Sequence, residues 1–152
     1  MSTSLKQTLQ SDLTEAIRGR DRLRSATLRM ALAAVTNEEV AGKVARQLSD
    51  ADVMKVLAKE AKKRKEAATA YTDASRPELA EQEEAELAVL EGYLPAPLGD
   101  EELGTLVARA VAESGATGMP QLGLVMKAVQ PLVAGRADGG RVAALVRKAL
   151  AG

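Results

Sequence analysis

The sequence predicts an all-α protein, on three observations. Its apolar residues are chiefly Ala, Leu and Val, and hydrophobic residues make up 46% of the 152 positions, with no Phe and no Trp. These residues, and the long side chains of Glu, Lys and Arg, lose little conformational freedom in a helix. Apolar residues also recur every three or four positions, and capping residues or prolines precede the periodic segments. We therefore expect helices along the whole chain.

Capping signals bound the first two expected helices. Ser4 and Gln7 form a capping box, and Gly19 suits a left-handed helix end. Asp21 can cap a second helix, which we expect Gly42 to close. This second helix carries apolar residues on two sides, which is typical of a central helix packed on two faces.

Two further helices complete a four-helix N-terminal domain, which we assign to residues 1–94. The pattern predicts a third helix from Ser49 to about Ala74, with lysines on the arc opposite its apolar stripe. Pro77 suits the first turn of a fourth helix, because the missing N–H of proline is not needed there.

Two prolines, Pro95 and Pro97, mark the clearest boundary, since each disfavours helical backbone in the residue before it. Three short helices are expected beyond them. Asp100 and Asp138 can cap the first and the third of them. The first ends near Gly115, and the second spans roughly Pro120 to Gln130, with Pro131 at its end. We assign residues 98–152 to a small C-terminal three-helix domain, joined to the first by a stiff proline hinge.

The composition excludes several kinds of chemistry. With no Cys and no His, the chain has no thiol nucleophile, disulfide, Cys/His metal site or imidazole acid–base group. No phosphate-binding loop motif is present. We expect no cofactor and no metal. No apolar run approaches the roughly 18 residues of a membrane span, and no signal-peptide pattern opens the chain, so we expect a cytoplasmic protein.

Charge is balanced overall but unevenly placed. Residues 1–74 carry a net charge of +4, residues 75–102 carry −8, and residues 103–152 carry +4. An acidic middle between two basic ends indicates either internal ion pairing or two basic surfaces that share a partner. Internal pairing is the favoured interpretation.

The third helix holds the most conspicuous charged cluster. Glu60 and Arg64 fall one turn apart within the apolar arc, which predicts a structural ion pair in preference to a functional pair in a cleft. Lys62, Lys63 and Lys65 lie on the polar arc. The favoured interpretation is a solvated helix face, and the alternative is a phosphate-binding surface.

The start of the last helix has two readings. Gly135, Asp138 and the basic residues around them suit a glycine stop, an Asp cap and a new helix. Alternatively, free backbone N–H groups beside Arg136 and Arg141 suit a bound anion such as phosphate.

Several segments, taken in order, resemble the GatB/YqeY family over nearly the whole chain. They are Thr27–Met30, Asn37–Glu39, Glu60–Arg64, Leu79–Glu91, Tyr93–Pro95, Gly123–Met126 and Gly135–Gly139. The chain looks like a stand-alone YqeY protein, and its later part is similar to the tail domain of the B subunit of the tRNA-dependent amidotransferase. That resemblance implies a link to tRNA, because the tail helps to hold tRNA in the amidotransferase. It also implies carbon–nitrogen ligase activity with glutamine as amido-N donor.

The sequence departs from the family tail at Leu124 and Ala143, where a Lys and an Asn are common. Both departures remove polar side chains that could contact RNA.

We therefore expect a non-catalytic helical adaptor that binds tRNA or a tRNA-handling complex, with no catalysis by the isolated chain. Lacking Phe and Trp, it would contact phosphates and not stacked bases. The candidate contacts are Lys127, Arg136, Arg141 and Lys148, with Lys62, Lys63 and Lys65 secondary. The alternatives are a protein-interaction module that docks an acidic partner, and an accessory component of a carbon–nitrogen ligase.

Overall fold

A computed structural model describes residues 3–151, which are helical or irregular with no β-strand among them. The all-α class is thus confirmed for this part of the chain. Contacts between residues divide the chain into two compact units, Met1–Leu94 and Pro95–Gly152. We call them the N-terminal unit and the C-terminal unit.

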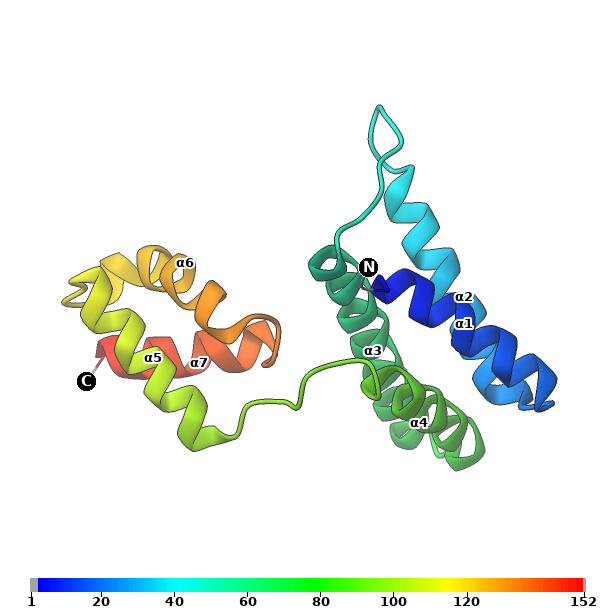
Figure 1. The fold of residues 1–152 in the computed structure, drawn as a ribbon. Helices are drawn as coiled ribbons and strands as arrows, with labels where there is room; N and C mark the ends of the chain where they lie inside the picture. The colour runs from blue at the N-terminus through cyan, green and yellow to red at the C-terminus, as the bar shows by residue number, and fades with distance from the viewer. Residues whose placement is uncertain (1–2, 152) are drawn as a thin grey trace. The chain divides into compact units, whose positions relative to one another are not determined.

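The N-terminal unit contains two helical hairpins (Figure 1). Helix α1 (Leu5–Arg18) packs along α2 (Arg22–Glu39), and α3 (Asp50–Asp73) packs along α4 (Pro77–Glu91). Helix α2 also contacts α3 and α4, as expected of a central helix. The buried side chains of these helices form one apolar core, made of Leu9, Leu28, Ala31, Val35, Val53, Leu57, Ala61 and Leu90.

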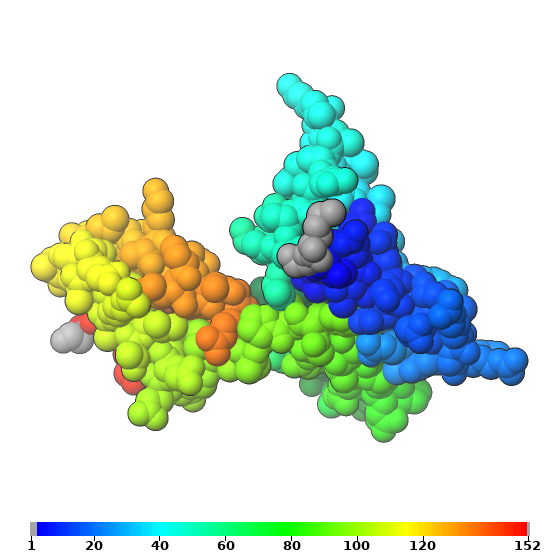
Figure 2. All heavy atoms as spheres, in the orientation of Figure 1, coloured from blue at the N-terminus to red at the C-terminus, as the bar shows by residue number. Residues whose placement is uncertain are grey.

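Local capping residues position these helices. The Ser4 and Gln7 side chains form the expected capping box at the start of α1, and the Ser49 hydroxyl accepts the backbone N–H of Asp52 at the start of α3. Pro77 is the first residue of α4. The loop between α2 and α3 projects from the rest of the unit (cyan in Figures 1 and 2), and its Val44 is 78% exposed.

Three details of α1 and α2 differ from the expectations. Gly19 keeps right-handed backbone with φ −79°, and Arg20 takes the left-handed conformation with φ 57°. Helix α2 ends at Glu39, with Val40 as its cap, before it reaches Gly42. Leu23 is 38% exposed, so one of the two apolar sides of α2 is only partly covered.

The C-terminal unit is a three-helix arrangement with its own core. Helix α5 (Asp100–Ser114) packs against α6 (Leu122–Val133) and α7 (Gly139–Ala151), and a 3-10 turn (Met119–Gln121) precedes α6. Valines dominate the buried cluster, which consists of Leu98, Leu103, Val107, Ala110, Val125, Val129, Val133, Val142, Val146 and Leu150.

Two helix ends in this unit also differ. Gly99 is the cap of α5 and Asp100 is already its first helical residue. Pro131 lies within the last turn of α6, which continues to Val133. Proline has no N–H for the helical bond to the carbonyl four residues earlier. The left-handed end comes instead at Ala134, with φ 50°.

Candidate nucleic-acid interface

The two arginines predicted to bind an anion are engaged within the C-terminal unit. Arg136 Nε donates to the carbonyl oxygen of Ala96 at 2.9 Å, and Arg141 Nη1 donates to that of Leu98 at 2.8 Å. Arg141 also forms an ion pair with the Asp100 carboxylate. The backbone N–H of Leu98 completes the set by donating to the Arg136 carbonyl at 2.8 Å. We call this set of contacts the arginine clamp, because it ties the segment after Pro95 to α7 and the turn before it.

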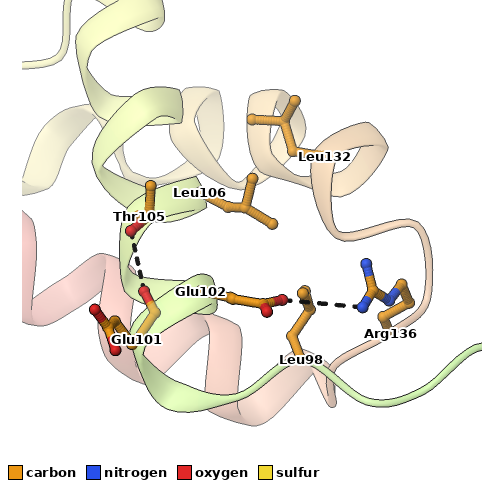
Figure 3. Close-up of a pocket in the computed structure, with 7 residues that line it drawn as sticks. All are labelled: Leu98, Glu101, Glu102, Thr105, Leu106, Leu132 and Arg136. Carbon is orange, nitrogen blue, oxygen red and sulfur yellow. Dashed lines mark hydrogen bonds and ion pairs between the residues drawn. The ribbon is translucent and has the colours of Figure 1, made fainter.

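A surface hollow of about 400 Å³ lies beside the clamp (Figure 3). Its lining residues are Leu98, Glu101, Glu102, Thr105, Leu106, Leu132 and Arg136. The Glu102 carboxylate lies 3.9 Å from Arg136 Nη2, and the Thr105 hydroxyl donates to the Glu101 carbonyl at 3.1 Å. Two glutamates and one arginine line the hollow, and the Glu102 carboxylate already faces the Arg136 guanidinium (Figure 3), so the hollow does not favour a phosphate.

The other predicted contacts of this unit are exposed lysines, Lys127 on α6 and Lys148 on α7. Within residues 3–151 neither forms an ion pair. Leu124, one of the two departures noted in the sequence, is 52% exposed on α6. It presents an apolar side chain, and not a cation, on this part of the helix.

On α3 the structure gathers the predicted lysines on one exposed face. Spacing of three and four residues places the first four of them on the side opposite Leu57, and Lys65 lies at the edge of that side, one turn after Ala61. We call this the lysine face, and its members are Lys55, Lys59, Lys62, Lys63 and Lys65. Glu66 interrupts it, and Lys63 Nζ contacts Glu60 at 3.2 Å while remaining 55% exposed.

Glu60 and Arg64 form an ion pair on the inner side of the same helix. Arg64 Nη1 lies 3.1 Å from Glu60 Oε2, and its Nε lies 3.5 Å from Glu86 Oε2 on α4. All three side chains are buried to more than four-fifths. Burial, followed by the neighbouring Glu83 charge, raises the pKa of Glu86, and Arg64 acts in the opposite direction. The network joins α3 to α4 and belongs to the core of the unit.

A second polar cluster surrounds Tyr93, just after α4. The Tyr93 hydroxyl donates to Asp12 Oδ2 at 2.6 Å and accepts from Arg24 Nη2 at 2.9 Å. Arg24 also lies 5.9 Å from the centre of the Tyr93 ring. Burial and the hydrogen bond to Asp12 raise the pKa of Tyr93 to about 12. This phenol therefore stays protonated and is occupied in joining α1 and α2 to the end of α4.

Sequence reasoning missed a third set of basic residues, at the corner between α1 and α2. Arg20, Arg22 and Arg29 line one shallow hollow of about 270 Å³. The signal was present as an arginine at every second position, Arg18, Arg20, Arg22 and Arg24, around a helix break. Outside a regular helix, residue spacing does not determine the direction of a side chain, so the spacing of these arginines could not show which of them share a surface.

Two possible site types are not found in the described part of the chain. Residues 3–151 contain no group of three or more acidic, His or Cys side chains placed to hold a metal ion. None of their helices is both long and apolar enough to cross a bilayer.

A family model described as Yqey-like protein matches residues 6–150, which spans both units. The chain belongs to the YqeY-like family. The resemblance inferred from the sequence is confirmed at this level. The chain is also 32% identical over 93 residues to an uncharacterized protein of Schizosaccharomyces pombe, a match covering 60% of this YqeY-like chain and 73% of the yeast protein.

Proposed function

We propose that this YqeY-like protein is a non-catalytic helical adaptor that binds tRNA, or a complex that handles tRNA, through phosphate contacts. The observation that carries the proposal is the lysine face of α3. Five lysines on one exposed helical face, with one glutamate among them, give a basic strip along the helix. Such a strip suits the regularly spaced charges of a nucleic-acid backbone.

The internal contacts of the chain favour some of its cations over others for phosphate binding. Arg136 and Arg141 would have to leave the carbonyls of Ala96 and Leu98 to bind a phosphate. Lys63 contacts Glu60 from an exposed position, and Arg64 stays paired with that buried carboxylate, so Lys63 exchanges it for a phosphate at little cost. We therefore place the main contacts on the lysine face, with Lys127 and Lys148 contributing from the C-terminal unit.

The chain offers little for recognising bases by stacking. Its aromatic residues are Tyr71 and Tyr93, and the Tyr93 hydroxyl is bonded to Asp12 and Arg24. Phosphate contacts carry no sequence information by themselves. The proposal therefore predicts binding that depends strongly on salt and weakly on the sequence of the RNA.

We also propose that the two compact units act as separate domains, 1–94 and 98–152, joined at Pro95 and Pro97. The prolines restrict the backbone torsions of the connection. Contacts of the basic residues in each domain with one RNA would then add through a short linker.

The test is fluorescence anisotropy with labelled tRNA over a series of salt concentrations. Substituting Lys55, Lys59 and Lys65 together by Ala is expected to weaken binding and to reduce the salt slope by about one unit per lost contact. The matched control is Arg109→Ala, which also removes an exposed cation from a helix, one that is paired with Glu113 at 2.9 Å.

Unchanged affinity and slope in the lysine variant would contradict the proposal. Capture of an acidic protein from cell extract without RNA would then favour a protein-interaction module. Recovery of a glutamine-dependent ligase would favour an accessory subunit of that enzyme.

A further inference from the structure

The chain reverses direction between α1 and α2, in the blue part of Figure 1. A shallow hollow lies at this corner. It is lined by Ile17, Arg20, Asp21, Arg22, Ser25 and Arg29. Its arginines come from two segments. Arg20 precedes α2, and Arg22 and Arg29 lie two turns apart on the same side of that helix.

These three guanidiniums are distinguished from their neighbours by their lack of partners. Arg18 is paired with Glu15 at 3.2 Å, and Arg24 lies 3.7 Å from Asp12. Within residues 3–151, by contrast, Arg20, Arg22 and Arg29 form no ion pair and no side-chain hydrogen bond. Their fifteen side-chain N–H groups, five from each arginine, therefore have no acceptor among residues 3–151.

The other polar groups of the hollow are already in use. The Asp21 carboxylate accepts the backbone N–H of Arg24 at 3.0 Å as the cap of α2. The Ser25 hydroxyl donates to the Asp21 carbonyl at 2.7 Å. With three arginines and one aspartate, the lining keeps a net charge of +2.

The number and type of cations decide the class of ligand. One side-chain carboxylate carries a single charge and two oxygens, which one guanidinium matches in a bidentate pair. A phosphoryl group carries more charge and up to three terminal oxygens, so it engages several guanidiniums at once. Lysine would supply the charge but not the planar fork, and every cation lining this hollow is an arginine.

We propose that this corner is a binding site for a phosphoryl group, separate from the lysine face of α3. The group belongs either to an RNA phosphate or to a small phosphorylated molecule. The shared chemistry is a phosphate bound by Arg20, Arg22 and Arg29.

The experiment is a titration of the full-length protein with inorganic phosphate, followed by amide NMR at constant ionic strength set with chloride. We expect saturable shifts confined to residues around 17–29. Arg22→Ala combined with Arg29→Ala should weaken the binding by roughly tenfold or more, since it removes two charge-assisted contacts. Both residues are exposed, so the fold should be retained, which the rest of the amide spectrum reports directly.

Arg18→Ala is the matched control, because Arg18 is an exposed arginine of the same corner that does not line the hollow. It should leave the phosphate shifts unchanged. Arg20→Gly is a third variant that suits the left-handed backbone at φ 57° and removes one guanidinium without strain. It should weaken phosphate binding on its own.

Two results would overturn the proposal. One is the absence of saturable shifts with phosphate. The other is an equal or stronger response to a hexaglutamate peptide, which would assign the corner to an acidic protein.

Adding tRNA to the phosphate-loaded protein identifies the source of the group. Displacement of phosphate points to RNA, and retention points to a small phosphorylated ligand. The phosphate titration gives its result whether or not tRNA binds the lysine face, so the two proposals are tested independently.

Discussion

Replacing Arg64 by Ala tests whether the charged network between α3 and α4 holds the N-terminal unit together. The Arg64 side chain is 14% exposed, and it contacts Glu60 at 3.1 Å and Glu86 at 3.5 Å. Its Nη2 also lies 3.3 Å from the sulfur of Met30 on α2. The substitution would therefore leave two mostly buried carboxylates without their shared cation.

The size of the loss follows from two opposing effects. Removing one partner from a buried ion pair typically costs about 3–5 kcal/mol, because the remaining charge is buried without compensation. Arg64 Nε is itself buried without a hydrogen bond, which lowers the value of the network before it is broken. Glu86, whose pKa burial already raises, can also take up a proton once Arg64 is gone. We therefore expect a loss of about 2–4 kcal/mol at neutral pH.

Urea unfolding followed by circular dichroism measures this loss. Lys63→Ala is the control, because Lys63 contacts the same Glu60 from an exposed position and should change the free energy of unfolding by less than about 1 kcal/mol. Replacing the network with Arg64→Met, Glu60→Gln and Glu86→Gln together should recover most of the stability, since no buried charge remains. The reasoning is refuted if Arg64→Ala and Lys63→Ala differ by less than about 0.5 kcal/mol.

Three further predictions concern other parts of the structure. The stability of Glu86→Gln relative to the wild type should be higher at pH 7 than at pH 5. Because the pKa of Glu86 is raised, the cost of burying its charge grows as pH rises from about 4.5 and is relieved by protonation as pH falls; an equal difference at both pH values in urea unfolding would contradict this. Tyr93→Phe should lower the free energy of unfolding by about 1–2 kcal/mol at pH 8. The difference in stability between wild type and variant should narrow between about pH 10 and 12, because the phenol of the unfolded chain loses its proton at a lower pH than that of the folded chain, and unfolding curves across that range test this. Proteinase K should cut first in the exposed loop around Val44 and near Pro95, as judged by mass spectrometry of early fragments, whereas early cuts inside α3 would place the domain boundary elsewhere.

Sequence reasoning located helices better than it located their ends. The Ser4 cap is predictable from sequence because a cap is a local interaction between a side chain and the backbone two or three residues ahead. The left-handed residue at Arg20 was missed because glycine, one position earlier, is the usual choice for that conformation. Pro131 predicts a helix end because it lacks an N–H, yet α6 continues for two residues beyond it.

The candidate site was harder to predict because its decisive contacts are distant in sequence. The partners of Arg136 and Arg141 are backbone carbonyls 40 and 43 residues away, and carbonyl groups have no sequence signature. Periodicity could place Glu60 and Arg64 within one arc of α3, but it could not show that Glu86 of α4 joins them. Periodicity predicts only which residues share a face of one helix. The hollow lined by Arg20 and Arg29 lies where α2 meets the turn before it, so periodicity could not predict it.

The arginine clamp determines where the C-terminal unit can be separated from the rest of the chain. A fragment beginning at Leu98 would place a charged terminal amine on a residue that is 3% exposed, and it would remove the Ala96 carbonyl that Arg136 binds. Burying that ammonium group is costly, so the shortened fragment should unfold at a lower temperature than one beginning at Pro95. The C-terminal unit therefore includes Pro95, Ala96 and Pro97, and a fragment that folds on its own must contain these three residues.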